Sequence, residues 1–302
     1  MTPIIAIENL SKKYRRNAVL NGLNLGVEEG SVFGLIGPNG VGKTTTIKIL
    51  MNILKADAGE ARVLGIPSRR LQPDHYSKIG YVSENQQMPG WMTIQYLLDY
   101  LKPFYTSWDS GYAGSLLEQF NLPRDRKIGQ LSRGMWMKTA LVSSLAYRPR
   151  LLILDEPFSG LDPVVRQDLI EGLVDSASET TLFISSHDLV DIESFATHIA
   201  FLSESGLQFS EEMSSLTSRF REVEVIVASP VMLCDCKNWP AHWLRPESSP
   251  SLIRFVESRF EPERTEGDIR RLFGGAAQVS VKAMPLREIF ITLARSLSKP
   301  VS

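Results

Sequence analysis

The stretch of sequence that decides the fold lies near the N-terminus and reads Gly37-Pro38-Asn39-Gly40-Val41-Gly42-Lys43-Thr44-Thr45. It fits the pattern G-x-x-x-x-G-K-[ST] at every fixed position, and this pattern is typical of loops that bind phosphate. A mostly apolar run, residues 32–36, precedes it as a buried parallel strand would. Apolar residues at helical spacing follow it as far as Leu54. The sequence therefore predicts a loop between a strand and the N-terminus of a helix, which is the context that the motif requires.

The chemistry of this loop indicates an ATP site. Its glycines let successive backbone N–H groups face inward and bind an anion, with the positive end of the helix dipole behind them. We expect Lys43 to reach the β- and γ-phosphates and the Thr44 hydroxyl to ligate Mg²⁺. The alternative, a glycine-rich turn with a surface lysine, is disfavoured by the flanking strand and helix patterns.

A second apolar run, residues 151–154, ends in two carboxylates, Asp155 and Glu156. A buried parallel strand places such groups at the carboxyl edge of a sheet, where ligands bind. Neighbouring residues point to opposite faces, so one carboxylate is expected to hold the metal and the other to accept a proton from an attacking water. In isolation, a helix cap or a salt bridge would explain them. His187 follows a further apolar strand, residues 181–186, and at the same edge a γ-phosphate contact is favoured over a structural role.

Three further signals are weaker when each is taken alone. Tyr14 could stack on an adenine ring, although an ordinary strand tyrosine explains it better. Ser132 is placed as the N-cap of a helix, with free backbone N–H groups after it, and an ordinary cap is the simpler reading. A tight turn, residues 159–162, ends at Asp162 before a helix predicted over residues 163–177.

Size and charge set limits on the class of protein. The chain has 302 residues, a hydrophobic content of 43% and a net charge of −1, which suits a packed protein with one large and one small domain. Acidic and basic residues are interspersed, so no nucleic-acid partner is expected. The densest basic run, residues 12–16, is read as a solvated turn.

The cysteines and the hydropathy of the sequence indicate where in the cell the chain is expected to work. Cys234 and Cys236 lie too close together for an ordinary disulfide and have no partners at zinc spacing, so reduced thiols are expected. Residues 1–10 do not have the pattern of a signal peptide. No run is long enough for a membrane helix, so any span must come from another chain.

The remaining patterns suggest two domains, residues 1–210 and 211–302. Residues 89–146 have helical periodicity and many aromatic side chains, most of which are expected in the core. A hairpin over residues 199–209 is expected to close the first domain. Beyond it the sequence predicts a small α/β domain, to which we assign no chemistry. Its predicted strands are 222–227, 252–256 and 278–281, its helices 265–273 and 285–296, and its irregular connection 229–251.

Taken together, residues 4–210 resemble the ATP-binding subunit of an ABC (ATP-binding cassette) transporter. Six motifs occur in the order of that family, which excludes chance agreement. The resemblance implies an α/β fold: a P-loop NTPase core, an antiparallel β subdomain and a helical subdomain at about 89–146. The matching segments are the adenine-stacking Tyr14, the Walker A loop 37–45, the signature Leu131-Ser132-Arg133-Gly134-Met135, the Walker B strand 151–156, the D-loop 159–162 and the switch His187.

Two positions depart from the family's pattern. The signature keeps Ser132 and Gly134 but has Arg133 and Met135 at its third and fifth positions. The serine hydroxyl and the helix-start amides are the parts needed to bind γ-phosphate, so the function should survive. At the Q-loop, Glu84 stands where the family has glutamine. A carboxylate can still ligate Mg²⁺ and orient water, but its charge can alter the coupling to a transmembrane partner.

The resemblance implies an ATPase at the cytoplasmic face of a cell membrane that drives export through a separate transmembrane permease. It also implies a second ATPase subunit, either a copy of this chain or a paralogue, in which Ser132 and Gly134 complete the phosphate site of the first. In that scheme Glu156 polarises the attacking water and Asp162 links the two sites. The tail, residues 285–290, is similar to a Leu-x-Glu-x-Phe element that ends many exporter ATPases.

Three other functions remain open from the sequence. An ABC-type ATPase acting on DNA or ribosomes would be expected to have a basic surface, a long coiled coil or a second cassette, and the sequence shows none of these. The ATPase of an importer would use the same chemistry with a different membrane partner. A scaffold subunit that binds ATP without hydrolysing it is disfavoured by the intact Lys43, Asp155, Glu156 and His187.

Overall fold

The computed structural model describes residues 3–15, 17–227, 239–249, 251–273 and 276–297. The chain divides into two compact units, Met1–Ser210 and Glu211–Ser302. Cys234 and Cys236, which were expected to be reduced, lie outside the described residues. Among the helices that the structure describes, none combines the length and the apolar character needed to cross a membrane.

The first unit contains two sheets, ordered β2-β1-β4-β5 and β10-β9-β3-β8-β7-β6. The strands of these sheets are β1 (Ile5–Tyr14), β2 (Asn17–Val27), β3 (Val32–Ile36), β4 (Ala58–Val63), β5 (Ile66–Pro67), β6 (Ile79–Ser83), β7 (Leu151–Asp155), β8 (Thr181–Ser186), β9 (His198–Ser203) and β10 (Gly206–Glu212). The α-helices of this unit are α1 (Lys43–Leu50), α2 (Pro73–Tyr76), α3 (Ile94–Leu101), α4 (Ser110–Gln119), α5 (Arg133–Leu145) and α6 (Pro163–Ser176). The fold class predicted for this part of the chain is confirmed.

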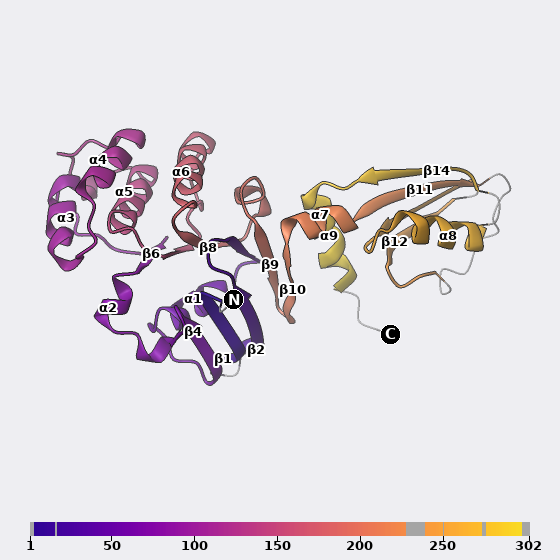
Figure 1. Ribbon diagram of the computed structural model, residues 1–302, viewed down its shortest axis with the longest axis horizontal. Coiled ribbons are helices and arrows are strands. Elements are labelled where there is room, and N and C mark those ends of the chain that lie inside the picture. The colour runs from indigo at the N-terminus through magenta and orange to yellow at the C-terminus, as the bar shows by residue number, and fades with distance from the viewer. Residues whose placement is uncertain (1–2, 16, 228–238, 250, 274–275, 298–302) are drawn as a thin grey trace. The chain divides into compact units, whose positions relative to one another are not determined.

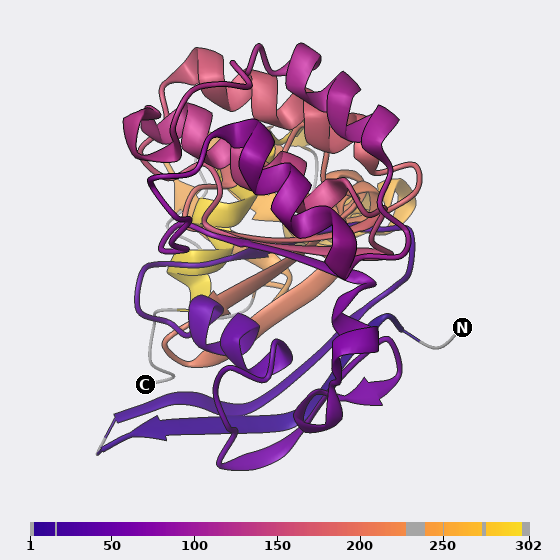
Figure 2. The ribbon, with the colours of Figure 1, turned by 90° about the vertical axis from the view of Figure 1, so that its left-hand side faces the viewer.

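The parallel strands of the second sheet position the functional loops. β8 pairs in parallel with β3 on one side and with β7 on the other, and every residue of the three strands is buried. Figures 1 and 2 show why: α3, α4, α5 and α6 lie on one side of this sheet, and α1 with the antiparallel sheet lies on the other. The carboxyl ends of parallel strands share an edge, so the loops after β3, β7 and β8 converge there.

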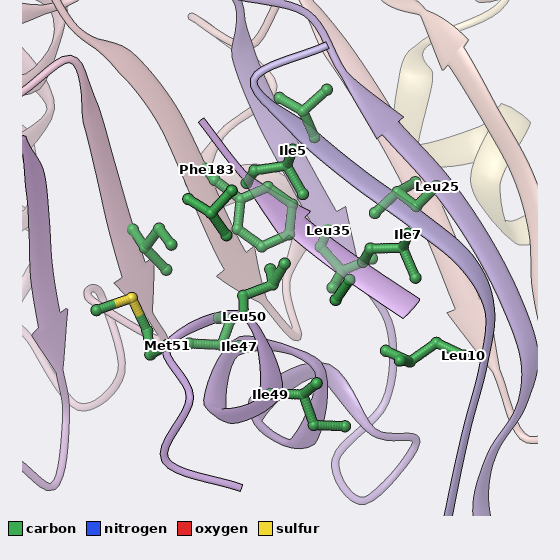
Figure 3. Close-up of a cluster of buried hydrophobic side chains, with 14 of the residues drawn as sticks. Ile5, Ile7, Leu10, Leu25, Leu35, Ile47, Ile49, Leu50, Met51 and Phe183 are labelled. Carbon is green, nitrogen blue, oxygen red and sulfur yellow. The ribbon is translucent and has the colours of Figure 1, made fainter. Parts of the chain in front are cut away.

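A hydrophobic core holds α1 between the two sheets (Figure 3). Ile47 and Leu50 of α1 have no exposed surface, and Leu35 and Phe183 extend the cluster to the parallel sheet. Burying such a side chain contributes about 1.5–3 kcal/mol. This core therefore fixes the position of α1 and of Lys43, the residue that begins it.

Most aromatic side chains of the helical segment are not buried, although Phe120 is, so the expectation that most of them lie in the core is wrong. Trp91, Tyr96, Tyr100 and Phe104 are exposed by 66%, 52%, 52% and 64%. The buried stripe of α3 consists of Ile94, Leu97 and Leu98. A helical period identifies one buried face, and both tyrosines fall outside it.

The second unit contains a sheet ordered β12-β13-β11-β14 with its own hydrophobic core. The elements of this unit are α7 (Met213–Arg219), β11 (Arg221–Val227), β12 (Trp243–Ser248), β13 (Leu252–Glu257), α8 (Pro262–Phe273), β14 (Ala276–Ala283) and α9 (Leu286–Leu297). The predicted strands and helices of this region are confirmed. The prediction of an irregular connection over residues 229–251 is wrong at residues 243–248, which form β12. Pro246 lies in β12, and a sheet edge tolerates proline. The register of β12 against β13 shifts between Leu244 and Glu247.

Candidate active site

The phosphate-binding loop joins β3 to α1, as the sequence predicts. Gly42 directly precedes the helix with φ of 111°, a backbone conformation that side chains rarely adopt. A Cβ atom at Gly42 would lie 2.6 Å from Cδ2 of Leu20. Both the backbone angle and the packing therefore require glycine at this point of the loop.

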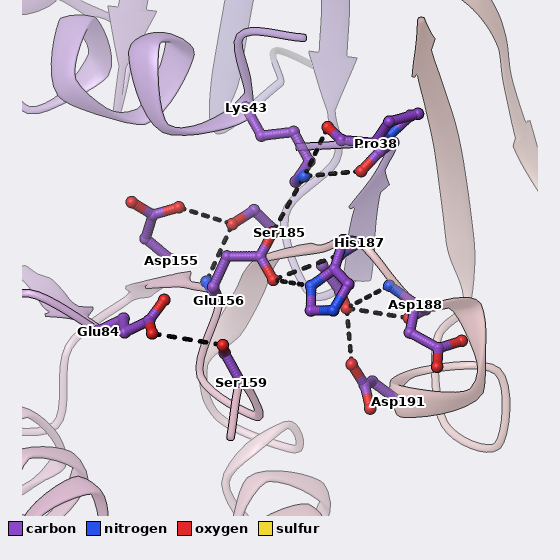
Figure 4. A network of polar contacts seen from close by, with 12 residues as sticks. Pro38, Lys43, Glu84, Asp155, Glu156, Ser159, Ser185, His187, Asp188 and Asp191 are labelled. Carbon is purple, nitrogen blue, oxygen red and sulfur yellow. Dashed lines mark hydrogen bonds and ion pairs between the residues drawn. The ribbon is translucent and has the colours of Figure 1, made fainter. Parts of the chain in front are cut away.

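Lys43 is almost wholly buried, with 4% of its surface exposed. Its Nζ atom donates hydrogen bonds to the carbonyl oxygens of Gly37 at 2.7 Å and Pro38 at 3.2 Å. The same atom lies 3.0 Å from Oε1 of Glu156 (Figure 4). The ammonium group therefore connects the phosphate-binding loop to the carboxylate that follows β7.

Asp155 ends β7 and points toward α1. Its Oδ1 atom accepts hydrogen bonds from the hydroxyls of Thr44 at 3.0 Å and Ser185 at 2.7 Å. Burial raises the pKa of the Asp155 carboxyl above its usual value, the two hydrogen bonds oppose this rise, and the charge of Glu156 adds to it. The Thr44 hydroxyl and the Asp155 carboxylate therefore lie side by side at the start of α1, where their oxygen atoms could ligate a metal ion.

Glu156 follows β7 and points away from Asp155. Its φ of 53° lies in the left-handed region, which is uncommon for a residue with a side chain. Its Oε2 atom lies 2.7 Å from Nδ1 of His187 (Figure 4). The two adjacent carboxylates have different neighbours, as predicted, but the left-handed turn at Glu156 and not the alternation of a strand separates them.

Glu84 follows β6 and lies beside the same edge. Its backbone N–H donates to the carbonyl oxygen of Asp155 at 3.1 Å. Its Oε1 atom accepts a hydrogen bond from the Ser159 hydroxyl at 3.3 Å and forms an ion pair with Nη2 of Arg133. The segments predicted to be the Q-loop, the signature and the D-loop therefore meet at one carboxylate.

The other predicted site residues lie apart from this cluster. Ser132 caps α5, where its hydroxyl accepts from the backbone N–H of Met135 at 3.3 Å. Asp162 caps α6 by accepting from two backbone N–H groups at 3.0 and 3.1 Å. Tyr14 ends β1 with 45% of its surface exposed, and its ring lies 5.9 Å from Nζ of Lys12. In the part of the chain that the structure describes, no hydrogen bond or ring contact joins Ser132 or Tyr14 to the phosphate-binding loop.

Residues 20–159 match the family model described as ABC transporter. The ABC transporter ATP-binding protein YtrB of Bacillus subtilis is 33% identical over 232 residues, which cover 76% of this chain and 79% of that protein. The chain belongs to the ABC transporter ATP-binding proteins. It carries the ATPase domain of that family and binds ATP.

Two other relatives of this ABC ATPase are named for the compounds that they transport. The bacitracin transport ATP-binding protein BcrA of Enterococcus faecalis is 32% identical, covering 74% of this chain and 73% of that protein. A fluoroquinolones export ATP-binding protein of Mycobacterium tuberculosis is 32% identical, covering 67% and 68%. Among solved structures, the ATP-binding subunit of an ABC transporter aligns with a TM-score of 0.65 at 24% identity, covering 71% of this chain and 92% of that chain. This structural likeness confirms the fold.

The sequence did not point to one residue of this ABC ATPase site, Ser185. Besides its bond to Asp155, its hydroxyl accepts a hydrogen bond from the backbone N–H of Glu156 at 3.1 Å. The sequence signal that could have identified Ser185 is its position, as a polar residue near the carboxyl end of the apolar strand 181–186. Its contacts depend on the pairing of β7 with β8, which periodicity does not reveal.

Proposed function

We propose that this chain is the ATP-hydrolysing subunit of an exporter, acting on MgATP and driving a separate transmembrane permease. The observation that carries the proposal is the gathering of Lys43, Thr44, Asp155, Glu156 and His187 at one edge of the parallel sheet. Subunits of this family act with transmembrane permeases and dimerise. The name of the fluoroquinolones export relative supports export as the direction of transport.

The phosphate-binding loop and its neighbours would hold the nucleotide and its metal. The backbone of residues 37–45 would cradle the phosphates, with Lys43 on the β- and γ-phosphates and Tyr14 on the adenine. The oxygens of Thr44 and Asp155 fit Mg²⁺, since it prefers oxygen ligands and these two atoms lie 3.0 Å apart. Bound there, Mg²⁺ would neutralise charge on the phosphates.

Glu156 and His187 would act on the hydrolytic step. The Glu156 carboxylate would accept the proton of the attacking water. Its backbone lies in the left-handed region, a strained conformation that is often found at functional sites. His187 lies beside that carboxylate and would contact the γ-phosphate. The Lys43 ammonium, which contacts Glu156, would stabilise the charge that develops on the phosphoryl group.

A second subunit would complete the site. The start of α5, capped by Ser132, is a helix N-terminus, and such a terminus is suited to bind the phosphate of another copy. This surface would be supplied in trans by the signature residues Leu131, Ser132, Arg133, Gly134 and Met135. Asp162 would link the two ATP sites. The phosphate-binding loop covers only one side of the γ-phosphate, whereas hydrolysis requires its negative charge to be neutralised on several sides.

The permease would hold the chain at the cytoplasmic face of the membrane. Within this proposal the second unit is an accessory domain, and α9 contains the Leu286, Glu288 and Phe290 of the tail element seen in exporter ATPases. We propose no nucleic-acid partner. The exposed aromatic side chains beside α3 offer contact area for a protein partner.

The variant Glu156→Gln tests this function. It should lower the release of phosphate from MgATP by about a hundredfold or more, the size of a general-base contribution. ATP binding should remain, and the variant should accumulate as a dimer when ATP saturates it, seen by light scattering. The matched control is Glu171→Gln, the same chemical change at an exposed position of α6.

Two results would overturn the proposal. If the parental chain releases no phosphate from MgATP, the ATPase function is wrong. If Glu156→Gln hydrolyses ATP at the parental rate, Glu156 is not the base.

A further inference from the structure

The side chains of Glu84 and Arg133 form an ion pair across 49 residues of sequence. Glu84 follows β6, and Arg133 is the first residue of α5. Oε1 of Glu84 also accepts the hydrogen bond from Ser159, in the turn after β7. These two residues are both departures from the family's pattern, and the fold brings them into contact.

Conformational stability is a weak explanation for this pair. The Arg133 side chain is 48% exposed and that of Glu84 is 30% exposed. Ion pairs this accessible to water are screened and contribute little to folding. The pair can therefore be exchanged or opened at low cost, and its effect should be sought in the nearby site.

Charge gives a better explanation. The backbone of Glu84 bonds to Asp155, so its carboxylate adds a third acidic group near Asp155 and Glu156. Glu156 is neutralised by Lys43, 3.0 Å away. Arg133 is the cation that faces Glu84. Without Arg133, a bare carboxylate would lie beside the place where a polyphosphate is expected, and like charges would repel.

The D-loop turn holds the guanidinium of Arg133 in position. A Cβ atom on Gly160 would lie 3.2 Å from Cζ and 3.3 Å from Nε of Arg133. The guanidinium therefore packs directly on the backbone of Gly160, next to Ser159. Contacts on two sides orient Arg133 toward Glu84.

We propose that Arg133 is a positioning residue for Glu84, and that these two departures from the family's pattern compensate each other. Arg133 neutralises the Glu84 carboxylate and fixes it against the D-loop, so that Glu84 can occupy the Q-loop position without repelling ATP. This inference rests on the function proposed for the site, and it adds to that function a charge requirement for nucleotide binding.

A double-mutant cycle tests this pairing. The variants are Arg133→Gln, Glu84→Gln and the double variant, with Arg126→Gln as the control. Arg126 contacts the sulfur of Met135 at 3.5 Å, so the control removes a nearby positive charge that does not face Glu84. ATP affinity is measured in EDTA by displacement of a fluorescent nucleotide, and kcat and KM are measured separately with MgATP.

Arg133→Gln alone should weaken ATP affinity in EDTA about fivefold to tenfold, the scale of coupling between contacting residues. In the Glu84→Gln background the same change should alter affinity by less than about twofold. With MgATP the loss should fall on KM more than on kcat. Arg133→Lys, which keeps the charge, should restore most of the affinity.

Equal effects of Arg133→Gln in both backgrounds would overturn the pairing and leave the ATPase function standing. An effect of Arg126→Gln as large as that of Arg133→Gln would also overturn it, because any nearby cation would then suffice. Absence of ATP binding by the parental chain would instead refute the proposed function. If Arg133→Gln lowers the thermal midpoint, the exchanged pair E84R/R133E tests the same claim and should bind ATP better than either of its single variants.

Discussion

At the scale of single residues, Ser185 is the contact on which the buried carboxylate depends most directly. Its hydroxyl donates the shorter of the two hydrogen bonds to Asp155, and the serine has no exposed surface. Ser185→Ala should lower the free energy of unfolding by about 1–3 kcal/mol, because a buried charged acceptor loses a donor. Ser143→Ala is the matched control, since its buried hydroxyl bonds only to a carbonyl oxygen, that of Ala140. Equal losses in urea unfolding would contradict the assignment.

Asp191 gives a prediction about pH. Burial raises the pKa of its carboxyl, while the hydrogen bond from Ser186 and the charge of Arg166 oppose the rise. The folded chain therefore holds this proton more tightly than the unfolded chain. Stability from Asp191 is fullest below the usual pKa of aspartate, about 3.9, and falls as pH rises through the raised value.

Asp191→Asn is neutral at every pH and should escape this loss. The free energy of unfolding of the variant, minus that of the parent, should increase as the pH rises above about 3.9. The ion pair with Arg166 forms only when Asp191 is ionised, so its effect is already contained in the folded pKa of Asp191 and leaves the sign of the slope unchanged. Urea unfolding at several pH values measures the slope, and a difference that falls with pH would contradict the sign.

Several residue positions followed from the sequence because they depend on local order. Lys43 begins α1, Asp155 ends β7 and His187 follows β8. Parallel strands bring their carboxyl ends to one edge of the sheet. The ion pair between Glu84 and Arg133 could not be predicted in this way. It depends on how α5 packs beside the end of β6, and that is a property of the tertiary fold.

At the scale of elements, α3 presents two chemically different faces. Ile94, Leu97 and Leu98 are buried, whereas Tyr96 and Tyr100 are half exposed. The helical periodicity predicted for residues 89–146 is confirmed in α3. It gave no information on the remaining aromatics, because burial of a second face depends on whether another element covers it.

The two faces of α3 should respond differently to substitution. Leu98→Ala should cost about 2–5 kcal/mol of unfolding free energy, since it opens a cavity. Tyr96→Ser with Tyr100→Ser should change it by about 0.5 kcal/mol or less, and should leave basal ATPase activity unchanged. If this face contacts the permease, the double tyrosine variant should be lost from detergent-solubilised complexes that retain the parental chain. Retention of the variant in those complexes would contradict a role in docking.

At the scale of the whole molecule, the sequence predicted the parallel core better than the second unit. A short apolar run such as that of β7, bounded by polar and turn residues, is typical of a buried parallel strand. β12 contains Pro246 and alternates poorly, so its pairing with β13 could only be seen in the fold. A strand that is stabilised mainly by pairing with its neighbour, as β12 is, has no clear strand pattern in its own sequence.

The two units have hydrophobic cores of their own, so the full chain is expected to unfold in two transitions. Differential scanning calorimetry of the Glu156→Gln chain avoids hydrolysis during the scan. MgATP at about 100 times its Kd should stabilise one transition by about 2.7 kcal/mol, because a ligand stabilises only the unit that binds it.

Phe255→Ala should shift the other transition. The ring of Phe255 is 1% exposed and stacks on Trp243 with centroids 3.8 Å apart, so its removal should cost about 3–5 kcal/mol in the second unit. The transition that responds to MgATP should stay in place in this variant, because Lys43, Thr44 and Asp155 all belong to the first unit. A single transition shifted by both changes would mean that the nucleotide site and the second unit unfold together.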